Sequence, residues 1–416
     1  MLPGSDDPAA SKLTLRELAT GSGTTPEVVE RLVQLGLIAE PANDRFRVSD
    51  IARVRLALAM DSSGISLEAV GQAVRSGRLS LGFIDSLLPD PGRLLPKTQR
   101  QVVEELGISE ELAQRIRTVL GTAGQSWDAS IRRDDAEILT LTARATAMGL
   151  DDDRGIRAIR VIVDNVRRIV ESQRDMLEEL LVEPALGSGL TEQEMLDRIA
   201  PVRFEYRRLG ARLLELVNAR LIDEGLIRVL VDHLEAALVR EGITPPREQP
   251  PPAIAFADLT GYTRLTEERG DELAAAYAGR MADVAQAAAQ MHGGRLVKVL
   301  GDGAMIHFGD AASAVRGALV LVEEARSREL PPARVGIDAG HVIHQDGDYF
   351  GSTVNVASRV ADYARPREVL VTADVVRRWD GGDQVRFQQL GPVPLKNVVD
   401  PVELFQAIPE RNTSSR

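Results

Sequence analysis

The sequence of 416 residues contains no cysteine, which excludes disulfide bonds, thiolate chemistry and cysteine-based zinc sites. Aromatic residues make up only 4% of the chain, so its cores must consist mainly of aliphatic side chains. Positive charge is also scarce, and the formal net charge of -12 argues against broad binding to nucleic acid or anionic lipid. No apolar run approaches the roughly 18 residues that span a bilayer, and the N-terminus lacks the pattern of a signal peptide. We therefore expect a soluble, cytoplasmic protein.

A proline-rich segment, residues 242–252, separates two stretches of different pattern. Its sequence is GITPPREQPPP, and its prolines remove backbone donors and disfavour helix in the residues before them. Upstream, apolar residues recur every three or four positions, for example from Ile156 to Val170, which is typical of amphipathic helices. Downstream, short apolar runs alternate with helical patterns, including one long helix expected over residues 266–294. The sequence therefore predicts an all-α region followed by an α+β domain that is large enough for its own core.

The helical part contains a weak internal repeat. Asp50 matches Asp135 and Gly64 matches Gly149, with the same spacing of 85 residues in both cases. Each copy opens with a hydroxyl residue followed by proline or glutamate, a combination that is typical of a helix start. We therefore expect two related helical units in succession.

Residues 12–78 resemble the winged helix-turn-helix of MerR-type regulators. The stretch LTLRELATGSGTTPEVVERLVQLGLI predicts the helix-turn-helix, and FRVSD predicts an edge of the wing. This resemblance implies either DNA binding or a module for packing or sensing. Acidic residues slightly outnumber basic ones over residues 1–95, and the helix that would enter the groove is not basic. Because neutralised phosphates supply most of the affinity for DNA, we favour the second alternative and expect no DNA partner.

The stretch FADLTGYTRL places Asp258 at the end of a predicted strand. Alternation sends the alanines of residues 253–257 to one face and Ile254 and Phe256 to the other. A carboxylate at such a strand end can ligate a hard cation, and the N–H groups of the following loop and helix start can hold phosphate. The alternative is that Asp258 only caps or anchors the loop.

The stretch KVLGDGAMIHF predicts a hairpin with Asp302 at its tip, between Gly301 and Gly303. Together, Asp258 and Asp302 could bridge two Mg²⁺ or Mn²⁺ ions for phosphoryl or nucleotidyl transfer, although a solvated turn is the alternative. Lys298 enters the same hairpin four residues earlier. It either forms a salt bridge with Asp302 or serves a different atom of a ligand.

The stretch GDYFGSTVNVASRV adds Asp348, Asn355 and Arg359. Asn355 and Arg359 are four residues apart and share one face of a predicted helix. An amide and a guanidinium aimed together suit a ribose and a phosphate oxygen. The alternative is an arginine that pairs with a nearby aspartate on the surface.

These three stretches, together with GIDAGHV, resemble the catalytic domain of class III nucleotidyl cyclases over residues 253–408. The resemblance implies a ferredoxin-like α+β fold that dimerises head to tail, with active sites at the interface. It also implies conversion of ATP into 3′,5′-cyclic AMP and pyrophosphate. The 3′-hydroxyl would attack the α-phosphorus in line, assisted by two divalent metal ions, Mg²⁺ or Mn²⁺.

The resemblance assigns a role to seven residues. Asp258 and Asp302 correspond to the metal-binding aspartates, Lys298 and Asp348 to the pair that reads adenine, Asn355 to the residue that orients the ribose, Arg359 to the one that stabilises charge on the phosphorus, and Lys396 to a triphosphate-binding lysine. A guanylate cyclase would carry a glutamate and a small or polar residue in place of the adenine-reading pair, so ATP is favoured and guanylate cyclase activity is the alternative. His292 and His307 are interpreted as structural.

Residues 97–241 resemble the all-helical regulatory domain of soluble actinobacterial adenylate cyclases. This resemblance implies that the helical part holds the catalytic dimer inactive and responds to pH or to a lipid or small-molecule effector. We therefore expect a helix-turn-helix module (1–95), a regulatory domain (96–241), a linker (242–252) and a catalytic domain (253–410), with autoinhibition through residues 221–253. The alternative from another functional class is a signal-responsive DNA-binding regulator with a secondary cyclase domain.

Overall fold

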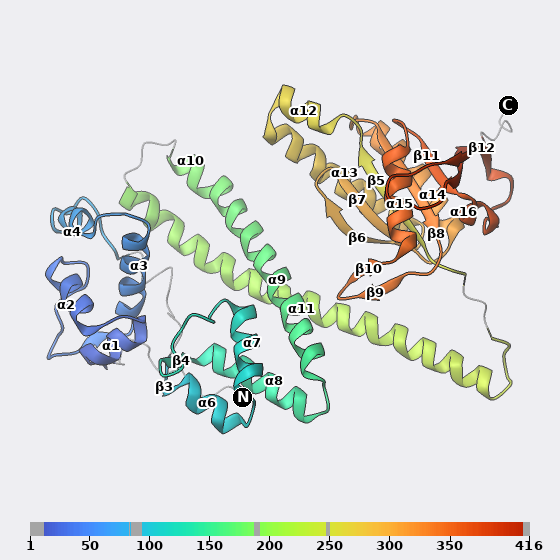
Figure 1. The fold of residues 1–416 in the computed structure, drawn as a ribbon. Helices are drawn as coiled ribbons and strands as arrows, with labels where there is room; N and C mark the ends of the chain where they lie inside the picture. Colours follow the sequence, from blue (N-terminus) through green and yellow to red (C-terminus); the bar gives the residue numbers. More distant parts are fainter. Residues whose placement is uncertain (1–11, 83, 85–93, 187–191, 247–249, 411–416) are drawn as a thin grey trace. The chain divides into compact units, whose positions relative to one another are not determined.

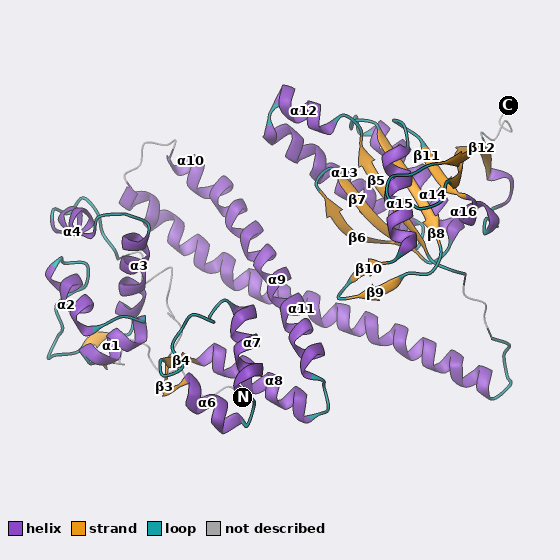
Figure 2. Cartoon of the chain, in the orientation of Figure 1, coloured by secondary structure: helices purple, strands orange, loops and turns teal. Residues whose placement is uncertain are grey.

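The computed structural model describes residues 12–82, 84, 94–186, 192–246 and 250–410, and it divides into two compact units (Figure 1). The first unit comprises Met1–Glu235 and the second Ala236–Arg416. The first is almost entirely helical and the second mixes strands with helices (Figure 2), which confirms the predicted fold classes. In the described part of the chain, no helix is both long and apolar enough to cross a membrane.

The first unit contains one arrangement twice, which confirms the internal repeat. Each copy has a strand, two helices, a second strand antiparallel to the first, and a third helix. The first copy consists of β1 (Lys12–Leu13), α1 (Leu15–Ser22), α2 (Pro26–Gln34), β2 (Phe46–Arg47) and α3 (Asp50–Ser62), and α4 (Leu67–Arg75) follows it. The second copy consists of β3 (Leu94–Thr98), α6 (Gln99–Leu106), α7 (Glu110–Leu120), β4 (Ser130–Arg132) and α8 (Arg133–Ala147).

Local sequence signals explain why both copies begin alike. Thr14 starts α1 with a capping box, in which its hydroxyl accepts from the Glu17 N–H at 3.2 Å and Glu17 accepts from the Thr14 N–H at 2.7 Å. Thr98 and Gln101 repeat this arrangement at the start of α6. Each cap contributes about 1 kcal/mol. The two copies have separate apolar cores, and their likeness to MerR-type regulators stays a prediction.

Two long helices complete the helical part of the chain. α9 (Asp152–Leu177) continues through a π-helical turn, Glu178–Val182, into α10 (Glu183–Leu186), and α11 covers Glu192–Arg240. α9 and α11 lie side by side, because Tyr206 of α11 contacts Met176 of α9. Many large apolar side chains of α11 are nevertheless exposed, among them Leu213, Leu221 and Leu234.

The second unit is built on a seven-stranded sheet with the order β12-β13-β11-β8-β5-β7-β6. The strands are β5 (Ala253–Leu259), β6 (Arg295–Leu300), β7 (Gly303–Phe308), β8 (Ala333–Ala339), β11 (Val369–Thr372), β12 (Val385–Val393) and β13 (Val402–Pro409). β5 is central and pairs antiparallel with both β7 and β8. A separate hairpin consists of β9 (Ile343–Gln345) and β10 (Asp348–Phe350).

Helices cover both faces of this sheet. The helices are α12 (Tyr262–Arg269), α13 (Asp271–Met291), α14 (Ala311–Ser327), α15 (Ser352–Tyr363) and α16 (Ala373–Arg377). The alanines of β5 face α13 and α14 in the main core, while Ile254 and Phe256 face α15, as the alternation predicted. α15 lies directly on β8, because a Cβ atom on Gly336 would be 2.0 Å from the backbone nitrogen of Ala361.

The single helix expected over residues 266–294 is wrong, because the structure divides this stretch at Gly270. Gly270 has φ 88° and ψ 164°, a conformation outside the helical region that glycine adopts more easily than other residues. Asp271 and Glu272 then supply acidic side chains to the first turn of α13, where the helix dipole favours them. The break leaves α12 as a short helix directly after the loop that follows Asp258.

Candidate active site

Asp258 and Asp302 meet at one end of the central strands. Asp258 lies opposite Gly303 in the β5–β7 ladder, so Asp302, in the preceding turn, lies beside it. A Cβ atom on Gly303 would be 3.0 Å from the Ala257 carbonyl oxygen and 3.5 Å from Asp258 Oδ1, so glycine keeps this approach open. Burial, and next the charge of Asp258, raise the pKa of Asp302. The structure therefore brings together the two carboxylates that the sequence singled out.

This pair of carboxylates suits a divalent cation. The repulsion that raises the pKa of Asp302 is relieved when a hard cation lies between the two side chains. Mg²⁺ typically uses one or two protein carboxylates and completes its shell with water and substrate phosphates. A site of this kind does not require three or more ligating side chains close together, and the described residues contain no such cluster.

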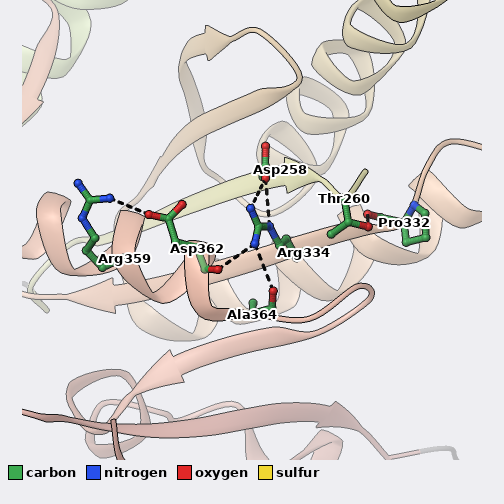
Figure 3. A network of polar contacts seen from close by, with 7 residues as sticks. All are labelled: Asp258, Thr260, Pro332, Arg334, Arg359, Asp362 and Ala364. Carbon is green, nitrogen blue, oxygen red and sulfur yellow. Dashed lines mark hydrogen bonds and ion pairs between the residues drawn. The ribbon is translucent and has the colours of Figure 1, made fainter. Parts of the chain in front are cut away.

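Arg334 also belongs to this site, although the sequence analysis did not identify it. Arg334 is the cross-strand partner of Asp258 on β8. It donates to Asp258 Oδ2 from Nη2 at 2.6 Å and from Nε at 3.0 Å, and its Nη1 donates to the carbonyl oxygen of Asp362 at 2.8 Å (Figure 3). The two side chains are only 24% and 31% exposed, so this pair is shielded in part from water. Arg334 therefore fixes the carboxylate of Asp258 and ties β5 to the end of α15.

α15 carries Asn355, which is exposed, and Arg359, which is half-buried. Arg359 Nη1 donates to Asp362 Oδ2 at 2.7 Å (Figure 3). This is the surface ion pair considered as the alternative for Arg359. Because the Asp362 side chain is 57% exposed, the pair contributes little free energy, and the guanidinium can leave it for a phosphate. Asp362 thus connects Arg359 to Arg334.

Lys298 and Asp348 form a second group. Lys298 Nζ donates to Asp348 Oδ2, and the Tyr349 N–H donates to Asp348 Oδ1 at 2.8 Å. Partial burial opposes ionisation of Asp348, but the hydrogen bonds from Lys298 and Tyr349 outweigh it, and the pKa of Asp348 is lowered. The carboxylate is therefore an ionised acceptor at neutral pH, next to an ammonium donor.

Lys396 lies in the exposed loop between β12 and β13. Its neighbours Leu395 and Val398 pack in the same apolar cluster as Val360, so the loop lies on the α15 side of the sheet. Within the described part of the chain, Lys396 forms no hydrogen bond or ion pair with the other six predicted residues. Its assignment stays a prediction.

The chain is similar to known cyclases over most of its length. Residues 246–406 match the family model of the adenylate and guanylate cyclase catalytic domain, and residues 48–223 match that of the adenylate cyclase regulatory domain. The chain is 30% identical to the pH-sensitive adenylate cyclase MT1302 of Mycobacterium tuberculosis, over 74% of this chain and 77% of the relative. It is 33% identical to an adenylate cyclase of Streptomyces coelicolor, over 66% of this chain and 69% of the relative. The crystal structure of the adenylyl cyclase CyaB from P. aeruginosa superposes with a TM-score of 0.34 and 22% identity, over 40% of this chain and 97% of that chain.

The catalytic-domain match and the similarity to the adenylate cyclases show that the chain is a class III nucleotidyl cyclase. Within this class, the chain belongs to the adenylate cyclases that carry a helical regulatory domain. Both family resemblances, for the catalytic and for the regulatory part, are thereby confirmed, while the predicted domain bounds stay predictions, since the regulatory model matches residues 48–223 and the resemblance was seen over 97–241.

Proposed function

We propose that this adenylate cyclase converts ATP into 3′,5′-cyclic AMP and pyrophosphate at sites shared between two copies of the chain. The observation that carries the proposal is the separation of the polar residues into two groups, with the acidic pair Asp258 and Asp302 in one and the pair Lys298 and Asp348 in the other. The acidic pair would hold the metal ions and phosphates, and the pair Lys298 and Asp348 would bind the base.

Lys298 and Asp348 fit adenine better than guanine. An ammonium only donates and an ionised carboxylate only accepts. Adenine offers an acceptor at N1 beside a donor at N6, whereas guanine offers the reverse order at N1 and O6. The ion pair between these two side chains, with the lowered pKa of Asp348, supports ATP as the substrate. Guanylate cyclase activity is the alternative, and variants that exchange the hydrogen-bonding character of this pair distinguish the two.

Asp258 and Asp302 would hold two divalent cations, Mg²⁺ or Mn²⁺, together with the phosphates of the substrate. Bound there, such ions lower the pKa of the 3′-hydroxyl and screen the charge of the triphosphate. Arg334 keeps the carboxylate of Asp258 in place through two hydrogen bonds.

The remaining residues would orient the substrate and stabilise the transition state. Asn355 offers an exposed amide for the ribose, which places the 3′-hydroxyl in line with the α-phosphorus. Arg359 would donate to the α-phosphate oxygens, where negative charge develops as pyrophosphate leaves. Lys396 would neutralise charge on the triphosphate from its exposed loop.

Exposed apolar side chains support a homodimer. Val299 and Leu300, between Lys298 and Asp302, are 44% and 49% exposed. Phe350, two residues after Asp348, is 50% exposed. α11 carries a further series of exposed leucine, isoleucine and valine residues. Surfaces of this kind typically contact another subunit, and a two-fold dimer would create two equivalent sites.

The regulatory part would restrain the catalytic dimer through residues 221–253. α11 ends at Arg240 and the first catalytic strand begins at Ala253, so a change in the helices reaches the catalytic domain after a short connection. The relative from M. tuberculosis is named as pH-sensitive, which makes pH the first signal to test. A lipid or small-molecule effector is the second.

Complementation between variants tests the shared site, in which Arg359 of one chain would act on phosphates held by Asp258 and Asp302 of the second copy. Asp302→Ala and Arg359→Ala should each lose at least a hundredfold in activity, since each lacks a group that acts in the transition state. A mixture with exchanged subunits should recover about a quarter of the wild-type rate, because half of the dimers would contain one intact site out of two.

The matched control is a mixture of Asp302→Ala with Asp258→Ala. Both changes lie in the metal-binding group, so no arrangement of two chains restores an intact site, and activity should stay absent. Co-purification of differently tagged chains measures subunit exchange. If exchange is complete and the first mixture does not recover, the sites are not shared.

A further inference from the structure

The hairpin that carries Asp348 is not part of the seven-stranded sheet. Among the described strands, β9 and β10 pair only with each other, with Tyr349 opposite His344, and residues 346–347 turn the chain with positive φ. No backbone ladder therefore fixes Asp348 next to Lys298 on β6. Besides its short connections to β8 and α15, side-chain contacts position the hairpin.

Tyr349 provides several of these contacts, in addition to the ion pair between Lys298 and Asp348. Its ring stacks on the ring of His307 on β7, with centroids 4.4 Å apart and an interplanar angle of 11°. Arg295 on β6 donates from Nη2 to the Tyr349 hydroxyl at 3.3 Å, and its guanidinium carbon lies 5.6 Å from the ring centroid. His344 contacts the same ring, with centroids 4.9 Å apart. Because Arg295 and His307 are cross-strand partners, Tyr349 is held on two neighbouring strands of the main sheet.

We propose that Tyr349 is a positioning residue for base recognition, which holds the carboxylate of Asp348 beside Lys298 through its contacts with His307 and Arg295. The inference rests on the base-reading role proposed above for Lys298 and Asp348. The coupling is direct, because the Tyr349 N–H donates to Asp348 Oδ1 at 2.8 Å. Displacement of the tyrosine therefore displaces both the carboxylate and one of its donors. His307, which the sequence suggested was merely structural, becomes the support of this residue.

The surroundings of His307 give this contact a pH dependence. The charged and titratable groups on neighbouring elements are Arg295 and Lys298 on β6, His344 on β9, and Asp348 and Tyr349 on β10. From β5 and α15, the apolar residues Ile254 and Ala357 belong to the adjoining hydrophobic cluster. Burial, and next Arg295 and His344, lower the pKa of His307, so the stack consists of uncharged rings at neutral pH. Protonation at acidic pH would put a second cation beside Arg295 and loosen the hairpin.

Steady-state kinetics of the full-length chain with ATP and GTP tests the proposal. Tyr349→Ala should raise the KM for ATP about tenfold while kcat changes less than about threefold, because the aromatic contact acts on substrate placement rather than on the reacting groups. The preference for ATP over GTP should decrease as well. Tyr349→Phe keeps the stack and loses the hydrogen bond from Arg295, so its KM should lie between those of the wild type and Tyr349→Ala.

His307→Phe separates stacking from charge. It keeps a ring against Tyr349 but cannot be protonated, so its KM at pH 7.5 should stay within about twofold of the wild type. The rise of KM that we expect for the wild type at acidic pH should be absent from this variant. A rise of the same size in His307→Phe would overturn the role of His307.

Two controls make the result interpretable. Phe387→Ala removes another aromatic pair of the same domain, with Trp379 at 5.5 Å, and should lower thermal stability without changing KM or the base preference. Lys298→Ala tests base recognition itself. If Lys298→Ala raises KM and Tyr349→Ala does not, the positioning role is wrong and base recognition stands. If neither variant changes KM or the base preference, the base-reading proposal is wrong as well.

Discussion

Lys298 forms its ion pair with Asp348, 50 residues further along the chain, and not with Asp302 in its own hairpin. Asp302 lies instead beside Asp258, at the same end of the neighbouring strands β7 and β5, where the two carboxylates repel each other. The hairpin from β6 to β7 therefore serves two groups of residues, because its lysine and its aspartate take part in different sets of interactions. This separation is what the shared-site proposal requires.

The base-reading pair can be tested by exchange of its hydrogen-bonding character. The double variant Lys298→Glu with Asp348→Ser should lose at least about tenfold in kcat/KM for ATP, because it presents an acceptor where adenine also has an acceptor. The same variant should gain activity with GTP, whose N1–H can donate to the new carboxylate. Chromatography of the cyclic nucleotide products measures both rates.

The single variant Lys298→Glu is the matched control for this exchange. It places two carboxylates together, so both nucleotides should be used poorly. If the double variant keeps its preference for ATP, these two residues do not read the base.

Arg334 is expected to be required for activity. Arg334→Met leaves Asp258 without its guanidinium partner and leaves the Asp362 carbonyl without this donor. We expect at least about tenfold lower kcat and a loss of about 1–3 kcal/mol in the free energy of unfolding. Arg334→Lys should be intermediate, since a lysine cannot reproduce the planar fork. Arg328→Met removes an exposed arginine that pairs with Glu324 and should change neither quantity. Wild-type kcat in Arg334→Met would contradict the role.

Autoinhibition predicts that removal of the helical part activates the enzyme. Deletion of residues 1–245 should raise the specific activity at neutral pH, because nothing would then restrain the catalytic dimer. Deletion of residues 1–95 alone should not reproduce this effect, since it keeps α11. Circular dichroism establishes that each fragment is folded. An unchanged or lower rate in a folded and dimeric fragment would show that the helical part does not inhibit.

Local signals in the sequence were sufficient for the site residues that lie within motifs. The alternation of residues 253–257 correctly predicted which side chains of β5 face α13 and α14 and which face α15. The glycines around Asp302 correctly predicted the tight turn. These features depend on neighbouring residues only, so a single sequence can reveal them.

Residues that act through distant contacts could not be recognised in this way. Arg334 lies 76 residues from Asp258, and only the antiparallel register of β5 and β8 makes them partners. His307 and Tyr349 likewise meet because a hairpin outside the sheet folds onto β7. The break at Gly270 had a local signal, a glycine followed by two acidic residues, which the sequence analysis read through as one helix.

Asp338 gives the catalytic domain a pH-dependent stability that can be measured. This residue of β8 is only 8% exposed, and the Thr372 hydroxyl donates to Asp338 Oδ1 at 2.6 Å. Burial raises its pKa from 3.8 to about 6, against the smaller opposing effect of the Thr372 hydrogen bond. Between about pH 4 and pH 6 the folded state therefore binds more protons than the unfolded state, so this residue lowers stability progressively as pH rises through that window. Asp338→Asn keeps an acceptor for Thr372 and should be more stable than the wild type by up to about 3 kcal/mol at pH 8, with the gain absent at pH 4.

Urea unfolding followed by Trp379 fluorescence, in a Trp127→Phe background, reports on this domain, because the chain has only these 2 tryptophans. The exposed Asp283→Asn serves as control and should show no such trend. A stability difference that is constant from pH 4 to pH 8 would mean that Asp338 does not titrate in this window.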